Sequence, residues 1–72
     1  MFKDRLSSRE KDVLQLIWEG MGNKEIASCL ELSITYVKNI RDRLRCKLDA
    51  QNNVQIVRKA IEKGFIRIDV SA

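Results

Sequence analysis

The chain has 72 residues, no histidine, and a net charge of +4 from 14 basic and 10 acidic side chains. So short a chain makes one small domain, and the missing histidine removes the commonest general base and the commonest metal ligand. Its two cysteines, Cys29 and Cys46, are too few for a disulfide framework and are not spaced as a metal or redox motif. We therefore expect no enzyme, no catalytic residue, no cofactor and no metal site. Each cysteine is expected to be a partly buried hydrophobe in a reducing cytoplasm.

The N-terminal end, MFKDRLSSREKD, is charged throughout and does not resemble a signal peptide. No apolar run approaches the roughly 20 residues that a membrane-spanning helix needs. We expect a cytoplasmic protein without membrane contact. Residues 1–72 are expected to form a single domain, with a core over 6–66 and an extended tail over 67–72.

Apolar residues recur at helical spacing almost throughout, which predicts an all-α domain of four helices. The first helix is expected to follow Ser7, because Glu10 three residues later completes a capping box, and to end near Gly20. Trp18 lies beside the apolar stripe of this helix. It is expected to be partial core, with an exposed contact for a partner as the alternative.

The second helix is expected to begin after Asn23 or Gly22 as its cap and to run to Leu30. A four-residue connection, Leu30-Glu31-Leu32-Ser33, places an apolar residue at its centre and a capping serine before the third helix. The third helix is predicted over 34–48, and its core side is expected to carry Val37, Ile40, Leu44 and Leu48.

The excess positive charge of the chain lies on this third helix. Residues 33–48 hold five basic side chains and one acid, whereas the rest of the chain holds nine of each. A localised basic stripe is expected of a nucleic-acid binder. It is equally compatible with an ordinary solvated surface, so charge alone does not decide between the two.

The fourth helix is expected to begin after Asn52 or Asn53 and to end at Gly64, with Phe65 closing over its last turn. Two apolar stripes run along it. Val54, Val57, Ala60 and Ile61 are expected to face the core. Ile56 and Ala60 form an offset stripe that is either an exposed helix–helix dimer contact or a surface packed on the tail.

Two short helices, a tight turn and a basic second helix together describe a helix-turn-helix. In that motif the second helix enters the major groove, which is about 12 Å wide, and the preceding helix crosses the DNA backbone.

The sequence also resembles a known family over residues 6–66. The opening LSSRE followed by VL, then NKEIA, LS, VKN, KL and finally GFI stand in the order and spacing of the DNA-binding domain of the LuxR/GerE (LuxR/NarL) family of bacterial transcription regulators. Each motif alone is weak, but the combination is specific. The resemblance implies a compact four-helix helix-turn-helix domain that binds double-stranded DNA as a homodimer through its fourth helix and regulates transcription. RNA polymerase is a further candidate partner, and no small-molecule ligand is expected within this domain.

Site residues are carried over by position. Lys38 and Asn39 fall where the family contacts bases, with Asp42 one turn further along the same face. Lys24 starts the helix that lies across the backbone. On the third helix, Thr35 and Arg45 share the face of Lys38, and Lys47 either touches phosphate or covers the core. Arg41 is expected at the boundary, its stem covering apolar surface. The dimer residues are expected to be Asn53, Ile56, Lys59 and Ala60.

The chain departs from the family pattern at four positions. Tyr36 stands where a phosphate-contacting Thr is usual, and its hydroxyl can donate from farther out. Ile40 replaces a common His and is expected in the core. Asp42 puts an acid on the groove face, where phosphates repel it but a cytosine amino group can donate to it. Glu31 stands where Gly is usual, and positive φ there would cost roughly 1 kcal/mol.

These departures leave an alternative function open. The same helix-turn-helix could bind another regulator or a polymerase subunit, with weak or no DNA binding. Whether the chain is a free-standing small regulator, which its initial Met1 slightly favours, or a fragment of a larger protein is also left open.

Overall fold

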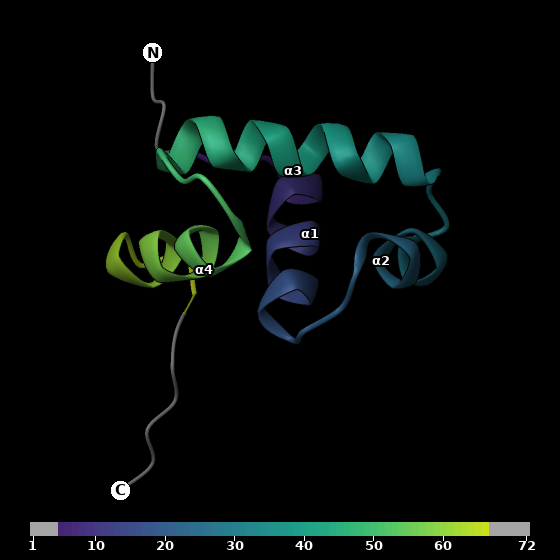
Figure 1. The fold of residues 1–72 in the computed structure, drawn as a ribbon, viewed down its shortest axis with the longest axis horizontal. Helices are drawn as coiled ribbons and strands as arrows, with labels where there is room; N and C mark the ends of the chain where they lie inside the picture. Colours follow the sequence, from purple (N-terminus) through teal and green to yellow (C-terminus); the bar gives the residue numbers. More distant parts are fainter. Residues whose placement is uncertain (1–4, 67–72) are drawn as a thin grey trace, which may run out of the picture.

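The computed structural model describes residues 5–66, which form four helices and, within that range, no strand (Figure 1). The helices are α1 (Ser8–Trp18), α2 (Asn23–Leu30), α3 (Ile34–Leu48) and α4 (Asn53–Glu62). In Figure 1, α3 lies across the molecule above α1, with α2 and α4 to either side. Both α1 and α3 pack against every other helix, whereas α2 and α4 do not pack against each other. The predicted all-α helix-turn-helix architecture is confirmed.

Three helices, α1, α3 and α4, begin after a residue whose side chain accepts from a free N–H group of the first turn, whereas Gly22 before α2 has no such side chain. The Ser7 hydroxyl accepts from the Glu10 N–H at 3.2 Å, and the Glu10 carboxylate accepts from the Ser7 N–H at 2.8 Å, as predicted. Ser33 caps α3. Of the alternatives left open, Gly22 precedes α2 and Asn52 caps α4.

Each helix also ends in the same way, in a Schellman motif whose left-handed residue is Gly20, Glu31, Asp49 or Gly64. In α2, for example, the N–H of Leu32 donates to the carbonyl of Ala27 at 2.8 Å. The residue after each left-handed position is apolar and returns to the core: Met21, Leu32, Ala50 and Phe65. The φ of +58° at Glu31 confirms the expected positive φ, and the φ of +54° at Asp49 was not predicted.

The core lies between α1, α3 and α4 and beneath α2. Its fully buried large side chains come from all four helices: Val13, Leu14, Ile26, Val37, Ile40, Leu44, Leu48 and Ile56. Ile40 is therefore core, as predicted.

Several predictions about burial were wrong. Cys29 and Cys46 are exposed rather than partly buried. Val54, expected in the core, is 71% exposed, whereas Ile56 is fully buried. The cause is tertiary: α4 packs on α1 and α3, and the side of α4 that it turns toward them carries Ile56 rather than Val54. The predicted extended tail lies outside the described residues beyond Ile66, which is itself buried.

No helix in the described part of the chain is long and apolar enough to cross a membrane.

Candidate nucleic-acid interface

The outward face of α3 carries most of the residues predicted to contact DNA. Because Val37, Ile40, Leu44 and Leu48 bury the opposite side of the helix, most positions between them face solvent, and only Arg41 and Lys47 are half-buried. The exposed residues on α3 include Thr35, Tyr36, Lys38, Asn39, Asp42 and Arg45. The structure thus brings these predicted residues together along one helix, and Lys24 is exposed at the start of α2.

A small depression of about 230 Å³ lies where α2 begins beside α3. Its lining combines basic, acidic and amide side chains: Asn23, Lys38, Arg41, Asp42 and Arg45. Three guanidinium or ammonium groups and one carboxylate in so small an area give a surface with net positive charge. Such a surface attracts anions more than it attracts cations.

The acid on this face, Asp42, is paired. One of its carboxylate oxygens lies 2.7 Å from a terminal nitrogen of Arg45, one turn further along α3. The side chains are 64% and 44% exposed, so the pair contributes less than about 1 kcal/mol and opens at little cost. Asp42 therefore lowers the local charge without fixing Arg45 permanently.

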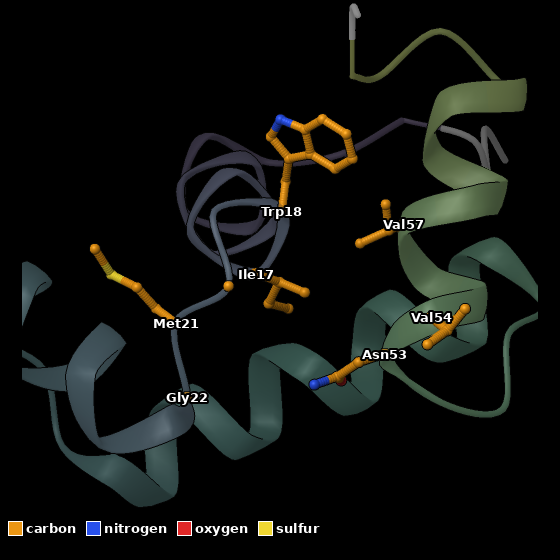
Figure 2. A pocket seen from close by; sticks show the side chains of 8 residues that line it. Ile17, Trp18, Met21, Gly22, Asn53, Val54 and Val57 are labelled. Atoms are coloured by element: carbon orange, nitrogen blue, oxygen red, sulfur yellow. The ribbon is translucent and has the colours of Figure 1, made fainter.

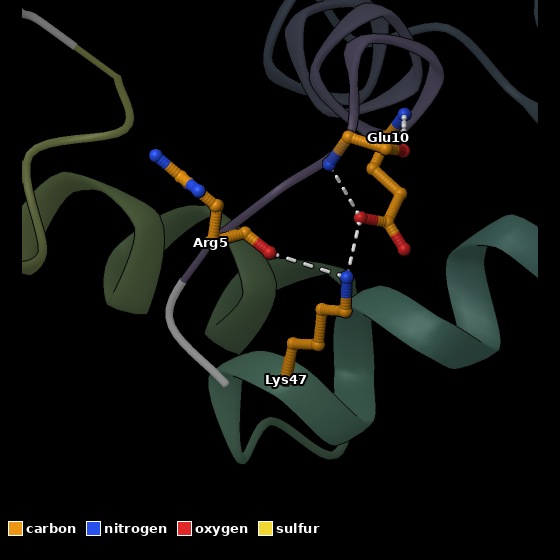
Figure 3. A network of polar contacts seen from close by, with 4 residues as sticks. Arg5, Glu10 and Lys47 are labelled. Atoms are coloured by element: carbon orange, nitrogen blue, oxygen red, sulfur yellow. Dashed lines mark hydrogen bonds and ion pairs between the residues drawn. The ribbon is translucent and has the colours of Figure 1, made fainter. Parts of the chain in front are cut away.

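Lys47 is bound within the domain. Its ammonium lies 2.7 Å from the Glu10 carboxylate and donates to the Arg5 carbonyl at 3.2 Å, so it joins the last turn of α3 to the first turn of α1 (Figure 3). The prediction of a phosphate contact at Lys47 is not supported, because its ammonium is engaged inside the fold.

The partner of this ammonium, Glu10, is the one buried charged residue among those the structure describes. Burial alone would raise the pKa of Glu10. The hydrogen bonds from Lys47 and from the Ser7 N–H, together with the Lys47 charge, outweigh burial and lower that pKa below its ordinary value of 4.5.

Arg41 has a role that the sequence analysis missed. One terminal nitrogen donates to the Asn23 side-chain oxygen at 2.7 Å, and the other donates to the side-chain oxygen of Asn53. The guanidinium therefore joins the first residues of α2 and α4. Its boundary position on α3 was predicted, but its partners lie 18 and 12 residues away and carry no local signal.

The predicted dimer residues on α4 do not form one exposed surface. Ile56 and Ala60 are both 0% exposed, so of the two alternatives for this stripe the exposed dimer contact is contradicted. Lys59 is half-buried, and Asn53 is exposed but bonded to Arg41.

A different apolar surface is open beside α4. A groove of about 480 Å³ lies between the end of α1 and the start of α4, and Figure 2 shows Ile17 and Val57 pointing toward one another across it. Trp18, 39% exposed, and Val54 stand at its edges. Trp18 is thus exposed rather than the partial core that was expected, and the alternative, an exposed contact for a partner, stays a prediction.

Comparison with known proteins adds an independent finding. The family model described as GerE, bacterial regulatory proteins, luxR family, matches residues 4–60. The chain is 37% identical over 65 residues to the uncharacterized response regulatory protein YgeK of Escherichia coli, covering 90% of the chain and 44% of YgeK. It is 34% identical over 62 residues to the transcriptional regulatory protein DesR of Bacillus subtilis, and this match covers 86% of the chain and 31% of DesR. It is 38% identical over 61 residues to the oxygen regulatory protein NreC of Staphylococcus haemolyticus, and this match covers 85% of the chain and 28% of NreC. The chain thus spans less than half the length of these relatives.

Proposed function

Since the chain belongs to the luxR family of bacterial regulatory proteins and is a DNA-binding transcription regulator rather than an enzyme, we propose that it reads duplex DNA by placing α3 in the major groove. The observation that carries this proposal is that α3 has one buried side and one exposed side. The exposed side presents Lys38, Asn39 and Asp42 with no element of the described chain covering them.

Each of these three side chains suits a different base. Lys38 can donate to the O6 and N7 acceptors of guanine, and Asn39 can pair with the N6 and N7 of adenine. Asp42 can accept from the N4 amino group of cytosine once phosphate or solvent draws Arg45 away. Sequence preference then comes from these contacts.

Affinity comes mainly from phosphate contacts. On the exposed side of α3 and the start of α2, the groups available for them are Lys24, Thr35, Tyr36 and Arg45. Arg41 and Lys47 are left out, because both are engaged inside the domain. Since bacterial DNA lies in the cytoplasm, the proposal places the protein there.

A second copy is proposed to bind beside α4, so that the dimer presents two α3 helices to two half-sites. Its contact is assigned to the exposed apolar surface formed by Val54, Val57 and Trp18, in place of the buried Ile56 and Ala60. Control of transcription through RNA polymerase would follow once the dimer sits on an operator.

The test is selection of bound duplexes from a random pool, followed by titration of the selected site. Lys38→Ala should weaken specific binding by about 1–3 kcal/mol, because it removes a base contact. Lys11→Ala, which removes an exposed lysine from α1, is the matched control for the loss of one charge. Equal affinities for the Lys38→Ala variant and the wild type would show that Lys38 does not contact a base.

If micromolar protein fails to shift any duplex in a gel at low salt, the result favours the alternative function, a helix-turn-helix that binds another protein. The acid on the α3 face, Asp42, is the observation that favours it. In that case the same face would bind another regulator or a polymerase subunit.

A further inference from the structure

Arg41 links two helices that otherwise have no contact. Neither α2 nor α4 packs against the other; each packs only on α1 and α3. The guanidinium of Arg41, on α3, lies between their first residues and donates one hydrogen bond to Asn23 and one to Asn53. We call this arrangement the Arg41 clamp.

The chemistry of the clamp depends on the shape of the guanidinium. Its two terminal nitrogens are held in one plane and point in different directions, so one side chain can bind acceptors on two helices at once. A lysine ammonium at the same position carries all its donors on one nitrogen, so it reaches two acceptors only where they lie close together, as those of Lys47 do, and it lacks the separated nitrogens of the guanidinium. The third donor of Arg41, Nε, is buried without a hydrogen-bond partner in the described part of the chain, so the two asparagines alone hold the group.

We propose that Arg41 is a positioning residue that fixes α2 and α4 relative to the DNA-contacting face of α3. The inference rests on the proposed function. The contact with Asn23 holds α2, whose start carries Lys24, against the groove face. The contact with Asn53 holds α4, and α4 carries the surface assigned to the second copy. The angle between α4 and α3 sets the distance between the two α3 helices of a dimer, so the clamp determines which half-site spacing the dimer accepts.

The variants that test the clamp remove one of its parts at a time. Arg41→Lys keeps the charge but replaces the two separated terminal nitrogens, which reach Asn23 and Asn53, with a single nitrogen. Asn23→Ala and Asn53→Ala each remove one acceptor at the first position of a helix, where alanine is well tolerated. Arg43→Lys, a change of the same kind at an exposed arginine of the same helix, is the matched control.

The DNA measurement is the affinity for paired half-sites set at the selected spacing and one base pair farther apart. With Arg41→Lys and Asn53→Ala, the preference for the selected spacing should fall by roughly three- to tenfold, as expected when one hydrogen bond of ordinary net strength is lost. Asn23→Ala should instead weaken binding to a single half-site. The salt dependence of Arg41→Lys should stay unchanged, because the number of phosphates neutralised is unchanged.

The opposite pattern of affinity and spacing preference among these variants would overturn the proposed role of the Arg41 clamp. If Arg41 leaves its asparagines and contacts phosphate, Arg41→Lys will retain both affinity and spacing preference, and the asparagine variants will bind as the wild type does. Absence of specific binding by the wild type is a separate result and counts against the proposed function.

A measurement without DNA tests the clamp itself. Spin labels on the native, exposed Cys29 of α2 and on a cysteine introduced by Glu62→Cys in α4 report the distance between these helices, in a background with Cys46→Ser. The distance distribution should be narrow with Arg41 present and with Arg43→Lys, and broader with Arg41→Lys. An equally narrow distribution in the Arg41→Lys protein would overturn the proposal whatever the DNA results.

Discussion

Replacing Lys47 by methionine removes the cation that pairs with the buried Glu10 carboxylate while keeping the length of the side chain. The Glu10 side chain is 3% exposed and that of Lys47 is 32% exposed. Breaking a fully buried pair typically costs about 3–5 kcal/mol, because one charge is left without compensation. Since Lys47 is about one-third exposed, water screens part of the interaction, and we expect Lys47→Met to lower the free energy of unfolding at pH 7 by about 2 kcal/mol.

The loss of unfolding free energy in Lys47→Met should depend on pH, in a direction that follows from the pKa of Glu10. In the wild type the folded-state pKa of Glu10 is lowered, so its contribution is present above the unfolded pKa and is lost as pH falls through the folded pKa. Without Lys47, burial still raises the pKa of Glu10 and only the Ser7 hydrogen bonds still lower it, so the charged carboxylate is less well stabilised at neutral pH. The gap in stability between wild type and variant should therefore be largest near neutrality and shrink as the carboxyl is protonated.

Urea unfolding followed by circular dichroism between neutral and acid pH measures this gap. Arg9→Met is the control, because the Arg9–Asp12 pair on α1 is 3.7 Å apart and exposed on both sides, and its loss should change stability by less than about 0.5 kcal/mol. A Lys47→Met penalty that stays constant across the acid range would refute the reasoning, since it would show that lost packing rather than the uncompensated Glu10 charge causes the penalty.

Other substitutions test other parts of the structure. Glu31→Gly should raise the free energy of unfolding in urea by about 0.5–1 kcal/mol, because glycine adopts the left-handed conformation without steric strain; a loss of stability would contradict this. Asp42→Asn should release Arg45 and tighten non-specific DNA binding, with a salt dependence steeper by up to about 0.9 in log–log slope; an unchanged slope would show that Arg45 does not reach phosphate. Val54→Asp should weaken self-association in sedimentation equilibrium with little change in monomer stability, whereas Ile56→Ala should lower monomer stability by about 2–5 kcal/mol; the reverse ranking would contradict the assignment of the two faces.

The local features of this fold could be predicted from the sequence because their causes are local. The capping box of Ser7 and Glu10 joins residues three apart, and the left-handed Glu31 follows from the short connection between α2 and α3. The buried side of α3 also follows from its spacing, since its apolar residues define a single stripe. The exposed candidate site, with Lys38 and Asp42, is the complement of that stripe.

The failures have a common physical reason. Apolar residues on α4 cover so wide an arc that spacing cannot say whether Val54 or Ile56 faces inward, and only the placement of α1 and α3 decides. The bonds of Arg41 join residues on three helices, and the pair of Lys47 with Glu10 spans 37 residues. Contacts between distant segments leave no periodic trace, so they could not be predicted in advance.

The lack of packing between α2 and α4 has a consequence for how this domain can change over evolution or by engineering. Apart from the bonds of Arg41, substitutions in α2 do not force compensating changes in α4, because the two helices do not pack against each other. On the proposed function, the backbone contact made by α2 and the pairing surface on α4 can therefore be altered one helix at a time, whereas changes in α3 affect both.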